Sequence, residues 1–140
     1  GGAVAHALGD VGVGTLFIYD ANTEAAAALA DAVEGRAITD LAAATAGSDG
    51  IVNATPMGMA KLPGMAIPAD LIEPRHWVAD IVYFPRETEL LATARARGCR
   101  VLDGSGMAVF QAVRAFELFS GLVPDPNRMR ATFEAFTDPN

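Results

Sequence analysis

The chain has 140 residues, of which 51% are hydrophobic, so it can bury the core of one domain. Charged residues make up only 19%, which excludes a disordered acidic chain. The net charge is -7 and Lys61 is the only lysine, so neither nucleic acid nor an anionic membrane surface is an expected partner.

One cysteine and two histidines exclude an internal disulfide and a cysteine-cluster metal site. The first residues lack the charged and apolar regions of a secretory signal. No apolar run approaches the roughly 18 residues that a membrane span needs. We therefore expect a cytoplasmic protein without a metal.

The first half of the chain alternates helical and strand patterns. An alanine-rich helix begins at the small residues Gly1 and Gly2, and Asn22 is placed to cap a second helix. The predicted elements are a helix over 1–8, a strand over 15–19, a helix from about 22 to 33, a short strand at 37–38 and a helix over 41–46.

The second half continues the alternation after a loop over 54–68 that is rich in proline and glycine. Gly98 and Gly121 are typical residues for helix ends. The predicted elements are strands over 51–53, 77–83 and 100–103, and helices over 87–97, 107–120 and 126–136.

Strands that alternate with helices predict an α/β fold with a parallel sheet and right-handed crossovers. The strands are continuous apolar runs, which indicates burial on both faces. We predict a Rossmann-like doubly wound parallel sheet that lacks its first strand, with C-terminal helices. The expected domains are an incomplete dinucleotide-binding domain over 1–121 and a helical extension over 122–140.

A dinucleotide fingerprint has a glycine turn, a helix and an acid about 20 positions further on. Gly1 fits the last glycine of such a turn, and Asp20 fits the acid at the end of a strand. A carboxylate there accepts hydrogen bonds from ribose hydroxyls and repels a 2′-phosphate, so we favour NAD, with NADP as the alternative. The other interpretation of Asp20 is a cap on the following helix, beside Asn22.

Three segments, in matching order and spacing, resemble the shikimate/quinate dehydrogenase family. Residues 53–59 (NATPMGM) are similar to its Asn-x-x-Pro-x-Gly-Met loop. Residues 80–91 (DIVYFPRETELL) are similar to its element with Asp, Tyr, Pro and Thr at fixed spacing. Residues 104–121 (GSGMAVFQAVRAFELFSG) are similar to its glycine turn and the helix with Met and Gln.

The resemblance implies a role for individual residues. Nicotinamide-cofactor contacts are expected from the glycine turn and from later strand ends, namely Gly1, Gly2, Asp20, Asn22, Asn53, Thr55, Pro56, Met57, Ile81, Gly104 and Met107. Tyr83 and Gln111 would bind a polyol acid, shikimate or quinate. Without the resemblance, Met57 and Met107 would be interpreted as core residues, and Gln111 as a side chain that hydrogen-bonds a backbone group. Asp80 would be interpreted as a structural acid that holds the following turn.

The implied reaction is hydride transfer between a ring alcohol of shikimate or quinate and nicotinamide, as in aromatic amino acid biosynthesis. In this family a Lys–Asp pair in a preceding substrate domain handles the proton. We expect that domain upstream, so no catalytic residue is assigned here and the fragment alone is predicted to be marginal and inactive. Ala108 stands where many members have Leu, which together with Asp20 favours a catabolic NAD enzyme.

Two other functions stay open. One is a stand-alone nucleotide-binding or regulatory module without chemistry. The other is a related two-domain dehydrogenase that acts on folate or amino acids, against which the helix with Met107 and Gln111 argues. A homodimer is the oligomer that we keep open.

Overall fold

The computed structural model describes residues 1–137, so the last three residues of the expected helical extension lie outside the described residues. The chain divides into two compact units, Gly1–Asp49 and Gly50–Asn140. Each unit has its own parallel sheet. The boundary that we expect after residue 121 stays a prediction.

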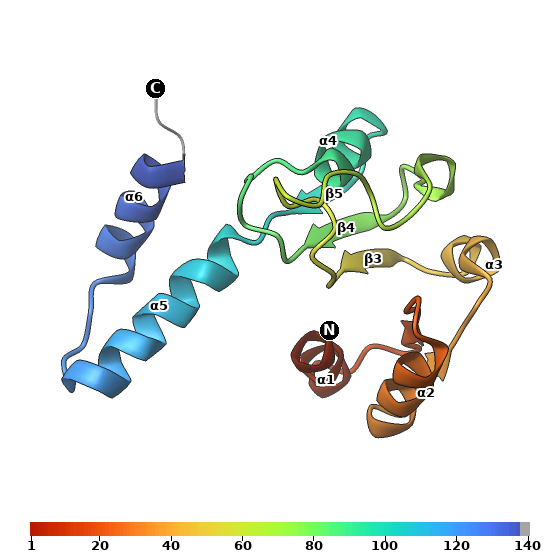
Figure 1. Ribbon diagram of the computed structural model, residues 1–140, viewed down its shortest axis with the longest axis horizontal. Helices are drawn as coiled ribbons and strands as arrows, with labels where there is room; N and C mark the ends of the chain where they lie inside the picture. The colour runs from red at the N-terminus through yellow and green to blue at the C-terminus, as the bar shows by residue number, and fades with distance from the viewer. Residues whose placement is uncertain (138–140) are drawn as a thin grey trace. The chain divides into compact units, whose positions relative to one another are not determined.

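The first unit is built around two short parallel strands. Its elements are α1 (Gly2–Asp10), β1 (Phe17–Ile18), α2 (Thr23–Ala32), β2 (Arg36–Ala37) and α3 (Leu41–Ala46). Phe17 pairs with Arg36 and Ile18 with Ala37, and α2 connects the two strands and contacts both (Figure 1). This is the βαβ arrangement that the alternating pattern predicts.

Side chains fix where the helices of this unit begin. Asn22 Oδ1 accepts hydrogen bonds from the N–H groups of Glu24 and Ala25, both at 3.1 Å, and so caps α2. Asp40 Oδ1 caps α3 by accepting from the Ala43 N–H at 3.0 Å. On α2, the buried Ala26 and Ala30 lie one turn apart on the face that packs on the strands.

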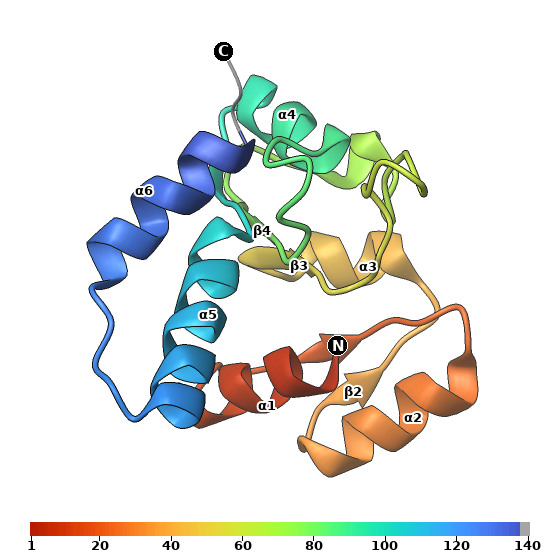
Figure 2. The ribbon, with the colours of Figure 1, turned by 60° about the vertical axis from the view of Figure 1, so that its left-hand side comes forward.

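The second unit holds a three-stranded parallel sheet in the order β3-β4-β5 (Figure 1). Its elements are β3 (Gly50–Asn53), the 3₁₀ turn η1 (Ala69–Leu71), β4 (Trp77–Asp80), α4 (Glu89–Ala96), β5 (Arg100–Leu102), α5 (Ser105–Ser120) and α6 (Pro126–Thr137). Thr88 caps α4, and Gly98 follows that helix with a φ of 83°. After a left-handed residue at Gly121, α6 turns back alongside α5 (Figure 2).

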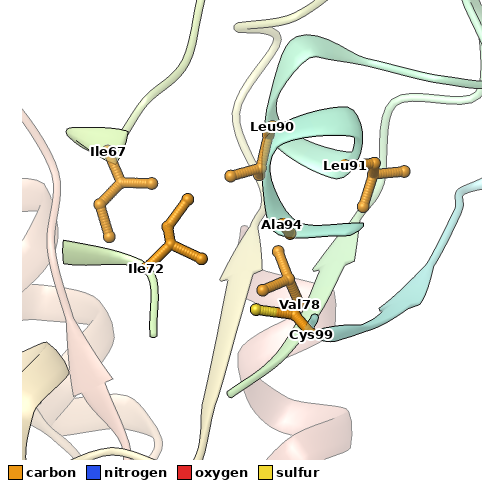
Figure 3. Close-up of a cluster of buried hydrophobic side chains, with 7 residues drawn as sticks. All are labelled: Ile67, Ile72, Val78, Leu90, Leu91, Ala94 and Cys99. Atoms are coloured by element: carbon orange, nitrogen blue, oxygen red, sulfur yellow. The ribbon is translucent and has the colours of Figure 1, made fainter. Parts of the chain in front are cut away.

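The core of the second unit lies between α4, the sheet and the segment before β4 (Figure 3). It consists of Ile67, Ile72, Val78, Leu90, Leu91, Ala94 and Cys99, all under one-tenth exposed. A fully buried Leu or Ile side chain contributes about 1.5–3 kcal/mol. This cluster therefore anchors β4, whose carboxyl end carries the polar groups described below.

The predicted elements and the α/β fold with C-terminal helices are confirmed, with shorter strands. The strand expected over 77–83 ends at Asp80, because the Asp80 side chain takes the Val82 N–H and turns the chain there. The turn η1 was not predicted. Within the described residues β1 pairs only with β2, and β3 pairs only with β4. Residues 1–137 contain no helix of the length and apolarity that crossing a membrane requires.

Candidate functional site

A buried amide and a buried carboxylate meet at the carboxyl ends of β3 and β4. Asn53 and Asp80 are register partners, and both are about one-twentieth exposed or less. Asn53 Nδ2 donates to Asp80 Oδ1 at 3.0 Å and to the Met57 carbonyl at 2.9 Å. Asn53 Oδ1 accepts from the N–H of Thr55 at 3.1 Å and from its hydroxyl at 2.7 Å. Asn53 thus shapes the loop that follows β3.

Asp80 shapes the loop that follows β4. Its Oδ1 also accepts from the Val82 N–H at 3.0 Å, and its Oδ2 accepts from the Thr88 hydroxyl at 2.7 Å. The same hydroxyl accepts from the Leu91 N–H at 3.3 Å at the start of α4. A buried carboxylate needs such donors to offset the loss of water. Asp80 is therefore a structural acid, the alternative that the sequence left open.

Gly104 lets the start of α5 lie against the loop after β4. A Cβ at this position would be 2.5 Å from the Ile81 carbonyl oxygen and 2.7 Å from that of Val82. Only glycine permits this approach without a shift of the backbone. Gly104 is itself buried, so its close approach is first of all to the chain's own backbone.

These loops, α5 and α6 line an open cavity of about 490 Å³. Five of its lining residues were predicted from the sequence, namely Thr55, Pro56, Ile81, Tyr83 and Met107. Six were not, namely Met59, Val82, Phe84, Phe133, Phe136 and Thr137. The predicted residues come from three motifs far apart in the sequence, and the fold brings them to one place.

Helix α6 supplies three of the lining residues that sequence reasoning missed. Phe133 and Phe136 belong to an amphipathic pattern, which is the one signal that could have indicated an inward face. The Phe133 ring lies 6.3 Å from the Tyr83 ring at an interplanar angle of 58°, a tilted aromatic contact. The sequence could not say which surface this helix would cover.

Four of the predicted residues lie near the cavity without lining it. Asn53 is buried beneath the loop that carries Thr55, and Met57 is half-buried in that loop. Gly104 precedes α5. Gln111 is exposed on α5, one helical turn beyond Met107 and on the same face.

The remaining predicted residues belong to the first unit. Gly1 and Gly2 lie at the start of α1. Asp20 is exposed after β1, and its Oδ1 accepts from the Asn22 N–H at 2.8 Å. The side chain that caps α2 belongs to Asn22, so the interpretation of Asp20 as that cap is wrong. That Asp20 and the cavity bind one cofactor stays a prediction.

Neither histidine belongs to a candidate metal centre. His76 is buried, and its Nδ1 accepts from the Glu73 N–H at 3.0 Å, while His6 is exposed on α1. In the described part of the chain no three His, Cys, Asp or Glu side chains gather where they could hold a metal ion.

Comparison with known proteins gives one consistent result. The family model described as Shikimate 5'-dehydrogenase C-terminal domain matches residues 104–132. A shikimate dehydrogenase (NADP(+)) of Streptomyces avermitilis is 54% identical, over 94% of this chain and 48% of its own length. A quinate/shikimate dehydrogenase (NAD(+)) of Corynebacterium efficiens is 51% identical, over 95% of this chain and 50% of its own length.

Solved structures agree with the sequence comparison. Quinate dehydrogenase from Corynebacterium glutamicum in complex with NAD superposes with a TM-score of 0.85 at 49% identity, over 96% of this chain and 51% of that chain. Shikimate 5-dehydrogenase from Thermus thermophilus in complex with NADP(H) and shikimate superposes with a TM-score of 0.82 at 33% identity. This match covers 94% of this chain and 49% of that chain. The chain thus spans about half the length of the relatives that it matches. By sequence and by fold, it is similar to about half of each of these shikimate and quinate dehydrogenases.

Proposed function

We propose that this chain forms the cofactor-binding half of a dehydrogenase that interconverts shikimate or quinate with its 3-dehydro form, using a nicotinamide cofactor. The observation that carries the proposal is the cavity of the second unit. Five residues from the three family motifs line it together: Thr55, Pro56, Ile81, Tyr83 and Met107. Relatives that are 54% and 51% identical to the chain, over 48% and 50% of their own length, are named as dehydrogenases of shikimate or quinate.

The cavity has the size and lining that a nicotinamide ring needs. Its volume of about 490 Å³ lies in the range of small-molecule sites, about 300–1,000 Å³. Met107 offers an apolar wall for a flat ring, and Thr55 and Tyr83 line the same cavity. When bound, the cofactor supplies hydride transfer, and this chain's residues hold it, orient it and exclude water.

The polyol acid would lie where both Tyr83 and Gln111 can reach its ring hydroxyls. Tyr83 is 47% exposed and lines the cavity. Gln111 provides both donors and acceptors for hydroxyl groups. We assign no acid–base residue in this chain: Lys61 is an exposed loop residue, and the family resemblance places the Lys–Asp pair in another domain.

Charge favours NAD over NADP. Residues 1–49 contain seven Asp and Glu residues against one basic residue, Arg36, which gives a net charge of -6 for this unit. Asp20 is exposed at the carboxyl end of β1, where a dinucleotide fold binds the adenosine ribose. A 2′-phosphate there would meet a carboxylate with no lysine or arginine in residues 20–35 to neutralise it. The relatives include enzymes named for either cofactor.

The decisive experiment uses the protein at its full natural length. NADH and NADPH are titrated by fluorescence, and oxidation of shikimate and of quinate is followed with each cofactor. We expect tighter binding of NADH and turnover of at least one of the two polyol acids. Binding without turnover of either would favour a nucleotide-binding module, and turnover of a folate or amino-acid substrate alone would favour the related dehydrogenase class.

A variant separates the substrate contact from the cofactor contact. Tyr83→Phe removes one hydroxyl and keeps the ring that packs on Phe133. We expect a KM for the polyol acid about tenfold higher, because one hydrogen bond to a hydroxyl is lost, with the Kd for NADH within about twofold of the wild type. An unchanged KM would remove Tyr83 from the substrate site.

A further inference from the structure

Asp103 lies at the junction between β5 and α5, directly before the cavity wall formed by α5. Its Oδ1 accepts a hydrogen bond from the Ser105 N–H at 2.9 Å and a second one from the Ser105 hydroxyl. Gly104 is the N-cap residue of α5 and has no side chain that could accept a hydrogen bond from the first turn of the helix. Asp103 therefore fixes the first turn of α5, which carries Met107.

The other carboxylate oxygen of Asp103 faces the loop after β4. Arg86 Nη2 lies 3.7 Å from Asp103 Oδ2, and both side chains are only about three-tenths exposed. Arg86 follows Tyr83 and Phe84 in the same loop, and both of these residues line the cavity. The ion pair thus links the loop with Tyr83 to the helix with Met107.

A third segment acts on the same carboxylate. Arg130 of α6 is half-buried. Burial by itself would raise the pKa of Asp103, but hydrogen bonds from Ser105 and the positive charges of Arg86 and Arg130 outweigh burial and lower that pKa. Asp103 is therefore an anion at neutral pH, held by Ser105 of α5 and by Arg86 of the loop after β4.

We propose that Asp103 is a positioning residue for the nicotinamide end of the site. It holds α5 and the loop after β4 in one arrangement, and these segments present Met107 and Tyr83 to the cavity. This inference rests on the proposed function. It assigns Asp103 a part that differs from that of Asp80, which joins the loops after β3 and β4.

Two ligands that differ only at the nicotinamide test the proposal on the full-length protein. NADH carries the ring, whereas ADP-ribose has the same adenosine, pyrophosphate and second ribose without it. Asp103→Asn keeps a carbonyl oxygen for Ser105 and removes the negative charge that pairs with Arg86. We expect a Kd for NADH about threefold to tenfold higher, as for one partly exposed ion pair, and an unchanged Kd for ADP-ribose.

Arg86→Gln provides a second, independent variant should Asp103→Asn fail to fold. Arg86→Gln should also weaken NADH binding without changing ADP-ribose binding. The double variant should bind NADH no more weakly than the weaker-binding of the two single variants, because both substitutions remove the same interaction. The matched control is Arg114→Gln, which breaks the exposed Arg114–Glu117 pair at 3.0 Å on the same helix. This control should change neither Kd.

The affinities for NADH and ADP-ribose decide between the possible roles of Asp103. Selective loss of NADH affinity in the variants supports the positioning role. Equal weakening of both ligands, or no weakening of either, overturns it while the proposed function stands. If the wild-type protein binds neither ligand, the proposed function itself fails, and the inference fails with it.

Discussion

Asn53 Nδ2 donates a hydrogen bond to Asp80 Oδ1 at 3.0 Å, so two residues 27 positions apart are joined at the ends of neighbouring parallel strands. Asn53 opens one family motif and Asp80 opens the next. Both side chains make their hydrogen bonds inside the protein. The motif residues that reach the cavity are instead their neighbours, such as Thr55, Ile81 and Tyr83.

Removing the Asn53 side chain should destabilise the second unit. Asn53→Ala takes one donor from the buried Asp80 carboxylate and both acceptor contacts from Thr55. We expect the free energy of unfolding to fall by about 1–3 kcal/mol, the cost of leaving buried polar groups unsatisfied. Urea denaturation measures the change. Asn127→Ala, at an exposed position of α6, is the control and should stay within about 0.5 kcal/mol.

Two glycines of the same segment should respond in opposite directions to alanine. In Gly104→Ala the new methyl would overlap the Ile81 and Val82 carbonyls, so we expect a loss of about 1–3 kcal/mol and weaker NADH binding. Gly106→Ala meets no atom within 4 Å and lies in α5, so it should stabilise the protein by up to about 1 kcal/mol. Equal effects in thermal melts of the two variants would contradict the close approach at Gly104.

Neutralising Asp20 should relax the choice of cofactor. Asp20→Asn removes the charge that would repel a 2′-phosphate and keeps an acceptor for the Asn22 N–H. We expect the ratio of kcat/KM with NAD to that with NADP to fall roughly tenfold, since a charge pair at a protein surface is worth about 1 kcal/mol or more. Asp31→Asn, an exposed acid on α2, should leave the ratio unchanged. A wild-type preference for NADP would contradict the assignment.

The lowered pKa of Asp103 predicts how its contribution depends on pH. A carboxyl whose folded pKa lies below its ordinary value of 3.8 stabilises the folded state above that value and loses this effect as pH falls through the folded pKa. The difference in unfolding free energy between wild type and Asp103→Asn should therefore be full at pH 6 and shrink below about pH 4. A difference that stays constant down to pH 2 would show that the ionised form contributes nothing.

Cys99 should react slowly in the folded protein. Burial raises the pKa of its thiol, against a smaller lowering effect of the Arg97 charge, and the Sγ lies 3.2 Å from the Glu73 carbonyl oxygen. Because the thiolate is the reactive form, labelling by an aromatic disulfide at pH 7.5 should be slow until urea unfolds the chain. Labelling at the same rate in both states would contradict a buried, protonated thiol.

Local patterns were enough to predict most helices and strands. The helix over 41–46 has the predicted bounds, and Asn22 caps the helix where the sequence placed it. These features depend on neighbouring residues: a polar side chain satisfies N–H groups two or three positions on. The strand predicted to run to Tyr83 was too long, because a buried side chain at Asp80 competed with the sheet for the Val82 N–H.

The sequence by itself determined the alternation of strands and helices, the excess of acid in residues 1–49 and the three motifs that predicted Thr55, Ile81, Tyr83 and Met107 as site residues. Only the tertiary structure decided that these four residues share one cavity, that α6 contributes Phe133 to it, and that Asn53 and Asp80 bind each other. The physical reason is the separation along the chain of the residues that interact. Propensity and capping act within a few residues, whereas a cavity wall and a buried hydrogen bond join segments that only packing brings together.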